Sequence, residues 1–189
     1  MEITIFGKGN MGKAIGGNFE KAGNRVTYGG RDFKGSLGDV VVLAVPYGAV
    51  DSILAVHKDE LAGKVLVDIT NPVNFDTFDG LVVPADSSAA AEIQKKVPEA
   101  LVVKAFNTTF AGVLAAGKVG DKEPAVVLAA SDSEEAKKTL AEALEGSGLS
   151  VVDAGSLKRA REMEALGFLQ ISLAAREKIS WTGGFAVIH

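Results

Sequence analysis

The chain has 189 residues, a formal net charge of −4 and no cysteine. A chain of this length can bury a core without disulfides, and the lack of cysteine excludes thiol nucleophiles and thiolate metal sites. Two histidines leave little for a histidine metal site, and the negative net charge argues against a sequence-independent nucleic-acid binder. We therefore expect no metal and no nucleic-acid partner.

The apolar segments of the chain are short. The run at residues 40–46 is far below the roughly 20 residues that cross a bilayer. Residues 1–2 lead directly into a strand-like run, so no signal peptide is expected. These features predict a cytoplasmic protein with no membrane partner.

Short β-rich segments alternate with helical segments. Strands are expected at residues 3–6, 26–28, 39–45, 64–69, 101–106, 125–130 and 151–153, and helices at 11–22, 48–58, 89–96, 134–145 and 157–179. A tail from Trp181 to His189 follows. Such alternation builds right-handed βαβ units, so we predict a doubly wound, mostly parallel α/β sheet of the Rossmann type with a C-terminal helix.

One domain is expected over residues 1–189. Within it, residues 1–108 should form a dinucleotide-binding core. Residues 109–189 should add further strand–helix units, the long C-terminal helix and the tail. In sheets of this kind ligands bind at the carboxyl ends of the strands, so the residues that follow each strand are the candidates for chemistry.

A glycine-rich loop follows the first expected strand. It consists of Gly7, Lys8, Gly9, Asn10, Met11 and Gly12. Glycine is frequent in this chain, so the G-x-G-x-x-G pattern alone is weak, but its position between a strand and a helix is typical of a dinucleotide fingerprint. The helix N-terminus would offer free N–H groups to a pyrophosphate. We predict that these six residues bind a dinucleotide; a glycine-rich turn without a nucleotide is the alternative.

The end of the second strand distinguishes NADP from NAD. An NAD site usually carries an acidic residue there, which bonds the ribose 2′-hydroxyl. Here Gly30 and Arg31 occupy that place, and the guanidinium of Arg31 suits a 2′-phosphate, with Lys34 adding charge. Asp32 lies beside Arg31, and a solvated surface arginine is the alternative. The sequence favours NADP(H) over NAD(H).

The tips of three later strands should border the same cleft. The residues concerned are Ala44, Val45, Pro46, Tyr47, Asn71, Pro72, Asn107 and Thr108. Val45 and Pro46 suit an apolar wall against the nicotinamide ribose, and the two asparagines can bond a carboxamide or a ring edge. Ordinary turn chemistry is the alternative for the whole group.

The segments that carry these residues resemble the deazaflavin (coenzyme F420)-dependent NADP oxidoreductase family. The matching segments are 3–12, 30–31, 44–46, 68–72, 104–108 and the helical residues 157–168. The resemblance extends to the NADPH-oxidising domain of membrane metalloreductases, which passes hydride to a flavin. It implies hydride transfer between NADP(H) and the flat ring of a deazaflavin or flavin, in a protein that often forms dimers.

The resemblance also assigns roles to residues. Those implied to hold NADP are Gly7, Gly9, Asn10, Met11, Gly12, Arg31, Val45 and Pro46. Those implied to flank the second ring are Asn71, Pro72, Asn107 and Thr108. The natural hydride acceptor stays open between a deazaflavin and a flavin.

No side chain stands out as a catalytic acid, base or nucleophile. We expect His57 on the surface, His189 mobile at the chain end, and Lys104 in a structural role within a strand. Hydride transfer between two flat rings requires alignment and exclusion of water rather than a catalytic side chain, so none is predicted. The alternatives are an NADP-linked dehydrogenase of a small carbonyl compound and a non-catalytic NADP(H)-binding redox sensor.

The last expected helix is apolar around most of its circumference at residues 165–175. More than one of its faces should therefore be buried. We expect the second face to contact another copy in a two-fold homodimer, with burial inside the monomer as the alternative. Trp181 and Phe185 in the tail either cover the flavin site or anchor the tail in the core, and the sequence leaves both open.

Overall fold

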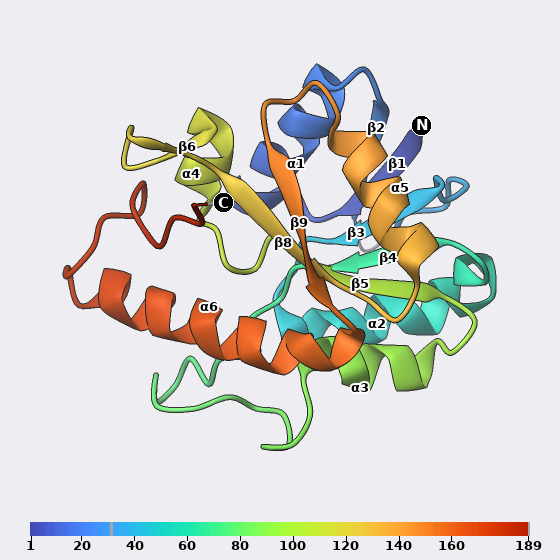
Figure 1. The fold of residues 1–189 in the computed structure, drawn as a ribbon. Helices are drawn as coiled ribbons and strands as arrows, with labels where there is room; N and C mark the ends of the chain where they lie inside the picture. The colour runs from blue at the N-terminus through green and yellow to red at the C-terminus, as the bar shows by residue number, and fades with distance from the viewer. Residues whose placement is uncertain (31, 189) are drawn as a thin grey trace.

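A computed structural model describes residues 1–30 and 32–188 (Figure 1). The predictions for Arg31, as a 2′-phosphate ligand, and for His189 fall outside the described residues.

One seven-stranded sheet runs through the described part of the chain in the order β2-β1-β3-β4-β5-β8-β9. Its strands are β1 (Glu2–Phe6), β2 (Arg25–Gly29), β3 (Val40–Leu43), β4 (Val65–Asp68), β5 (Leu101–Ala105), β8 (Val126–Ala130) and β9 (Ser150–Gly155). Neighbouring strands are parallel except for β5 and β8, which are antiparallel. The predicted doubly wound, mostly parallel α/β sheet is confirmed.

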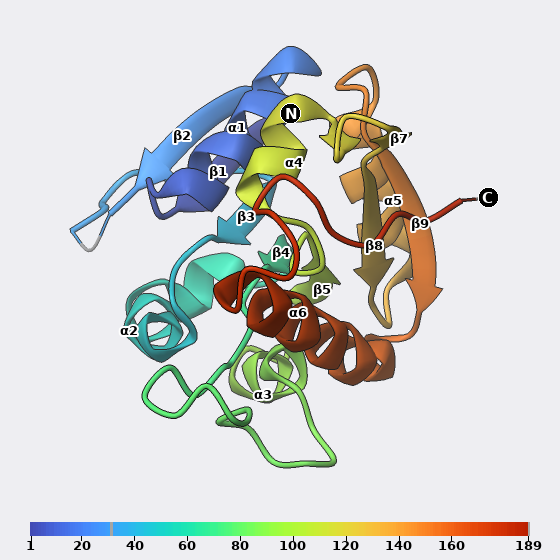
Figure 2. The same ribbon diagram turned by 90° about the vertical axis from the view of Figure 1, so that its left-hand side faces the viewer.

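Helices cover both faces of the sheet (Figure 2). One face carries α1 (Asn10–Lys21), α4 (Ala111–Ala116) and α5 (Glu134–Leu144). The other carries α2 (Tyr47–His57), α3 (Ala89–Lys96) and the start of the C-terminal helix α6 (Ala160–Ala175). Strand β3 shows why two layers form: Val40 and Val42 pack into one hydrophobic cluster, Val41 and Leu43 into the other, and all four are buried.

Several elements differ from the prediction. Helix α4 and the small hairpin of β6 (Lys118–Val119) and β7 (Glu123–Pro124) were not expected, because elements this short show no hydrophobic period. Short 3-10 turns, η1 (Lys58–Leu61) and η2 (Leu157–Arg159), follow α2 and precede α6. Helix α6 ends at Ala175, four residues before the expected end, and Glu177 then adopts a left-handed backbone with φ 57°.

Candidate functional site

The glycine-rich loop connects β1 to α1 where the order of strands reverses, between β1 and β3. A Cβ at Gly7, whose φ is 112°, would lie 2.1 Å from the carbonyl oxygen of Ala44. A Cβ at Gly12 would lie 2.2 Å from the carbonyl oxygen of Gly7. Both positions therefore require glycine for the loop to pack between β3 and α1.

Gly9 has a different role in the same loop. It is the N-cap residue of α1, and a Cβ placed there would meet nothing within 4 Å. Among the residues that the structure describes, no side chain caps this helix end, and the first turn of the helix holds no acidic residue. The first backbone N–H groups of α1 thus have no side-chain acceptor among the described residues, an arrangement that suits a phosphate anion.

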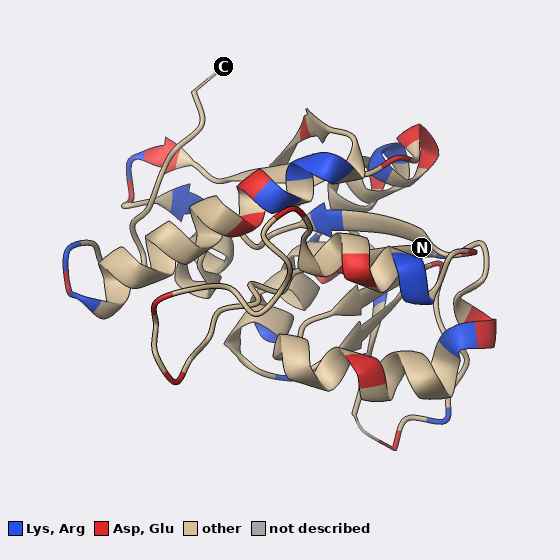
Figure 3. Cartoon of the chain, turned by 90° about the horizontal axis from the view of Figure 1, so that it is seen from below, with Lys and Arg blue, Asp and Glu red and all other residues tan. Residues whose placement is uncertain are grey.

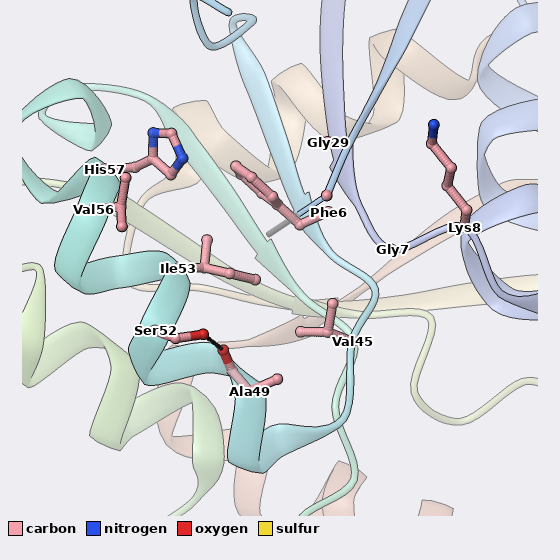
Figure 4. Close-up of a pocket in the computed structure, with 11 residues that line it drawn as sticks. Phe6, Gly7, Lys8, Gly29, Val45, Ala49, Ser52, Ile53, Val56 and His57 are labelled. Carbon is pink, nitrogen blue, oxygen red and sulfur yellow. Dashed lines mark hydrogen bonds between the residues drawn. The ribbon is translucent and has the colours of Figure 1, made fainter. Parts of the chain in front are cut away.

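A first cavity, the α2 pocket, opens between this loop and α2 and has a volume of about 590 Å³ (Figure 4). It is lined by Phe6, Gly7, Lys8, Gly29, Gly30, Val45, Ala49, Ser52, Ile53, Val56 and His57. The walls are mostly apolar side chains, with Val45 and Ile53 on opposite sides (Figure 4). Such a slot suits a flat base.

His57 lies at the edge of the α2 pocket, and the prediction of a surface position was wrong. Only 4% of the residue is exposed, and its ring centroid lies 5.1 Å from that of Phe6 and 6.1 Å from that of Phe33. Its Nδ1 lies 3.1 Å from Oε1 of Glu60. The reason is helix geometry: His57 follows the buried Leu54 by three residues, so both lie on the face of α2 that packs on the sheet.

A second cavity, the tail pocket, lies at the carboxyl ends of β1, β4 and β5 and has a volume of about 400 Å³. It is lined by Asn10, Met11, Ile69, Asn71, Asn107, Thr109, Phe110, Ala111, Gly112, Ile171, Trp181 and Thr182. The glycine-rich loop thus contributes to both cavities, with Gly7 and Lys8 on one side and Asn10 and Met11 on the other.

Asn71 and Asn107 hydrogen-bond to each other beside the tail pocket. Nδ2 of Asn71 donates to the carbonyl oxygen of Asn107 (2.8 Å), and Nδ2 of Asn107 donates to Oδ1 of Asn71 and to the carbonyl oxygen of Met163 (both 2.9 Å). Helix α6 comes so close that a Cβ at Gly167 would lie 2.4 Å from Oδ1 of Asn71. Within the described residues, the buried Oδ1 of Asn107 has no hydrogen-bond partner, so the pair keeps one acceptor free.

A buried ion cluster supports the strands that carry these asparagines. Nζ of Lys104 lies 2.8 Å from Oδ2 of Asp68 and 2.8 Å from Oε1 of Glu164, and all three side chains are fully or almost fully buried. Oε2 of Glu164 accepts a hydrogen bond from the N–H of Ala89 at the start of α3 (2.8 Å). Burial raises the pKa of the Glu164 carboxyl, and the ammonium of Lys104 opposes that rise. The cluster ties β4, β5, α3 and α6 together.

Some of the residues that were predicted to bind the cofactor or the acceptor line neither of the two cavities. Those that line neither are Gly9, Gly12, Lys34, Ala44, Pro46, Tyr47, Pro72 and Thr108. Thr108 is buried, and its carbonyl oxygen accepts a hydrogen bond from Nε2 of Gln170 (3.2 Å). Its neighbour Thr109 lines both the tail pocket and the small cavity described next. Thr108 instead lines a small separate cavity with Phe185.

Some lining residues carry no sequence signal of their own. Ser52 and Ile53 belong to an ordinary helix, and Ile171 belongs to an apolar stretch of α6. Their place at the cavities follows from how the helices pack. Asp68 was within reach of sequence analysis, because it ends a buried strand at the expected edge of the sheet.

The sequence is similar to those of known NADP-linked reductases. A sequence model of the family described as NADP oxidoreductase coenzyme F420-dependent matches residues 35–72. The F420-dependent NADP reductase of Methanocaldococcus jannaschii is 33% identical over 150 residues, which cover 77% of this chain and 66% of that protein. Metalloreductase STEAP3 of Rattus norvegicus is 30% identical over 184 residues, which cover 87% of this chain and 36% of that protein. The chain thus spans about two thirds of the first relative and about a third of the second.

A solved structure agrees over the full length. The crystal structure of a candidate F420-dependent NADP reductase from Arthrobacter sp. FB24 superimposes with a TM-score of 0.82 at 26% identity and covers 99% of both chains. The sequence and structural similarities together show that this chain belongs to the coenzyme F420-dependent NADP oxidoreductase family.

Proposed function

We propose that this protein is an NADP-dependent oxidoreductase that transfers hydride between NADP(H) and a flat-ring acceptor, a deazaflavin of the F420 type or a flavin. The observation that carries the proposal is the pair of cavities on the two sides of the glycine-rich loop. A pyrophosphate at the N-terminus of α1 would leave one half of the dinucleotide for each cavity.

The α2 pocket is proposed to hold the adenosine half. Its apolar slot suits adenine, and Gly30 in its wall leads directly to Arg31 and Lys34, the proposed ligands of the 2′-phosphate. The full set proposed to bind NADP(H) is Gly7, Lys8, Gly9, Asn10, Met11, Gly12, Gly30, Arg31, Lys34, Ala44, Val45, Pro46 and Tyr47.

The tail pocket is proposed to hold the nicotinamide beside the acceptor ring. Asn71 and Asn107, with their neighbours Pro72 and Thr108, are the residues proposed to flank the hydride acceptor, and the two asparagines line the pocket. The two cofactor rings supply the hydride chemistry when bound. The chain's own residues orient the rings and exclude water.

The lining of the tail pocket supports this division of labour. No carboxylate, histidine, lysine or tyrosine is among its described lining residues. A dehydrogenase of a small carbonyl compound needs a proton donor beside the substrate oxygen, whereas transfer between two rings does not. The names of the relatives, F420-dependent NADP reductase and a metalloreductase, agree with a ring acceptor.

We also propose a homodimer through α6 and a cytoplasmic location. Residues 165–175 of α6 carry no charge (Figure 3), and Leu169 on this helix is 51% exposed. An apolar helical surface of this kind suits a two-fold contact with a second copy. Among the described residues, no helix is long and apolar enough to cross a membrane.

The division of the chain is a proposal of the same kind. We propose that residues 1–108 form the dinucleotide-binding core of one domain, and that residues 109–189 complete it. The support is the tail pocket, which takes lining residues from both parts.

The test follows NADPH oxidation by its absorbance, with FMN, FAD, riboflavin and a deazaflavin offered in turn and NADH as the control donor. We expect turnover with one ring system and a preference for NADPH. Tight binding of NADPH with no oxidation by any of the four acceptors would contradict the proposal and favour a cofactor sensor or a carbonyl reductase.

A further inference from the structure

The chain beyond α6 turns back across the molecule (Figures 1 and 2). Backbone groups anchor this tail, residues 176–188, on other elements at two places beyond its first turn. The N–H of Gly120, between β6 and β7, donates to the carbonyl oxygen of Thr182 (2.8 Å), and the N–H of Phe185 donates to Oε1 of Gln170 on α6 (3.2 Å). The tail is therefore anchored on the hairpin and on α6.

Helix α4 is shaped to receive the tail. A Cβ at Gly112 would lie 3.0 Å from both the carbonyl oxygen of Trp181 and Cγ2 of Thr182, so glycine allows the tail to lie directly on the helix. The indole of Trp181 packs on Phe110 with a centroid distance of 4.9 Å and an interplanar angle of 57°. These contacts fix the place of the indole at the tail pocket.

Trp181 stands at the mouth of the tail pocket. It lines the cavity together with Asn71 and Asn107, yet it is 54% exposed, whereas Phe110 behind it is 9% exposed. A large aromatic side chain that is held in place but half exposed keeps apolar surface in contact with water, which is unfavourable. The exposed face of the ring is therefore available to pack against a ligand.

We propose that Trp181 is a specificity-determining residue, the aromatic wall against which the flat acceptor ring packs in the tail pocket. The proposal rests on the proposed function, because it assigns the acceptor to this pocket. Aromatic rings gain from offset or edge-to-face contact beyond the area they bury. The indole therefore selects a flat heteroaromatic acceptor over a small aliphatic carbonyl compound.

Kinetics of three variants test the role. Trp181→Leu should raise the acceptor KM by roughly tenfold while the Kd for NADPH changes less than about twofold. Trp181→Phe keeps a flat ring and should recover most of the loss. Phe185→Leu is the matched control, because Phe185 lies in the same tail at similar exposure (47%) but lines the small cavity beside Thr108. Its acceptor KM should stay at the wild-type value.

Either of two results would overturn the role. One is an acceptor KM of Trp181→Leu equal to wild type. The other is an equal rise of KM in Trp181→Leu and Phe185→Leu, which would mean that the tail loosens as a whole. If Trp181→Leu does not fold, Trp181→Phe and the fluorescence measurement below decide the question.

Tryptophan fluorescence separates this inference from the proposed function. Trp181 is the only tryptophan in the 189 residues, so its quenching by acrylamide reports on this wall alone. With NADP⁺ bound, riboflavin or a deazaflavin should shield the indole from acrylamide, and 2′,5′-ADP, which fills only the adenosine site, should not.

The four combinations of outcome are distinct. Shielding with turnover supports both proposals. Turnover without shielding overturns the role of Trp181 and leaves the enzyme, whereas shielding without turnover leaves the aromatic wall and removes the hydride transfer. If neither shielding nor turnover is seen, the role of Trp181 and the proposed hydride transfer are both contradicted.

Discussion

The two cavities beside the glycine-rich loop are built from very different parts of the chain. The α2 pocket takes all its lining from residues 6–57, through two strands, the loop and one helix. The tail pocket takes its lining from residues 10–182, through the loop, two strand ends, α4, α6 and the tail. Local motifs thus shape the α2 pocket, the proposed adenosine half, whereas long-range packing shapes the tail pocket, the proposed acceptor half, where the nicotinamide would meet the acceptor ring.

This difference predicts that the acceptor half is easier to damage from a distance. Its asparagine pair depends on α6 through Met163 and Gly167, and the strands that carry the pair depend on the Lys104 cluster. The α2 pocket has mainly apolar packing behind it. Substitutions can break each half separately.

The largest effect is expected from Lys104→Met. The change leaves the carboxylates of Asp68 and Glu164 buried without their cation, and breaking such a pair costs about 3–5 kcal/mol of folding free energy. Urea unfolding measures this loss. The matched control is Lys96→Met, whose partner Asp51 is exposed and which should cost less than about 1 kcal/mol. Equal losses in the two variants would contradict a special role for the buried cluster.

Gly167→Ala should press α6 away from the asparagine pair. The new Cβ would meet Oδ1 of Asn71 at 2.4 Å, and overpacking of this kind costs about 1–3 kcal/mol. We expect a higher acceptor KM with little change in NADPH binding. Gly17→Ala in α1, where a Cβ meets nothing, should instead stabilise the protein by about 0.5–1 kcal/mol. A Gly167→Ala variant with wild-type stability and KM would show that α6 does not position the pair.

Gly9→Ala probes the cofactor half without disturbing the fold. A Cβ at Gly9 would meet no other side chain or packed backbone of the described residues within 4 Å, but it would occupy the space proposed for the pyrophosphate. We expect NADP⁺ to bind about tenfold more weakly, as titration calorimetry would measure, with an unchanged melting temperature. In Gly12→Ala the new Cβ would clash with the carbonyl oxygen of Gly7, so this variant should have both a lower NADP⁺ affinity and a lower melting temperature. Unchanged NADP⁺ affinity in Gly9→Ala would place the pyrophosphate elsewhere.

The smallest effect belongs to a pair outside both cavities. Hydrogen bonds from Lys137 and from the N–H of Gly155 lower the pKa of the Asp153 carboxyl. A lowered pKa in the folded state adds stability above the unfolded pKa, near 3.8, and this stability is lost as the pH falls through the folded value. Asp153→Asn should therefore cost about 0.5 kcal/mol at pH 7, since the pair is partly exposed.

The pH dependence checks this smaller effect. Urea unfolding of wild type and Asp153→Asn should differ by a constant amount from pH 7 to about pH 5 and by less below it. If the difference in unfolding free energy between the two proteins grew as the pH fell, the result would contradict a lowered pKa of Asp153 in the folded protein. NADPH oxidation should be the same in both proteins, because neither Asp153 nor Lys137 is among the lining residues of either cavity.

The same contrast explains what the sequence could predict. Gly7, Lys8, Gly30 and Val45, which the sequence predicted to bind the cofactor, all line the α2 pocket, and each lies within two residues of the end of β1, β2 or β3. Their role in cofactor binding stays a prediction. The sequence also indicated the asparagines of the tail pocket from their place at strand ends. It could not place His57 inward, since a polar residue at the end of an apolar helix face resembles a surface residue.

Residues brought in by long-range packing were beyond sequence analysis. Ile171 and Ala111 reach the tail pocket only because α4 and α6 fold against the ends of the strands. The antiparallel strand β8 likewise depends on its pairing with β5, which no local pattern encodes. For Trp181 the sequence left two alternatives. The structure shows its contact with Phe110 and its place in the lining of the tail pocket, and its role beside an acceptor ring stays a proposal.

The central claim is that the nicotinamide ring and the acceptor ring lie together in the tail pocket. It is tested most directly by following the hydrogen that passes from C4 of the nicotinamide to the acceptor. NADPH deuterated at C4, in each of its two epimers, would be reacted with a deazaflavin in a single turnover. The accepting atom of this ring is a carbon, which retains its hydrogen. We predict that one epimer delivers its deuterium to that carbon with none released to water. Reduction of the acceptor with hydrogen from solvent, or binding of NADPH without any transfer, would contradict a shared pocket for the two rings.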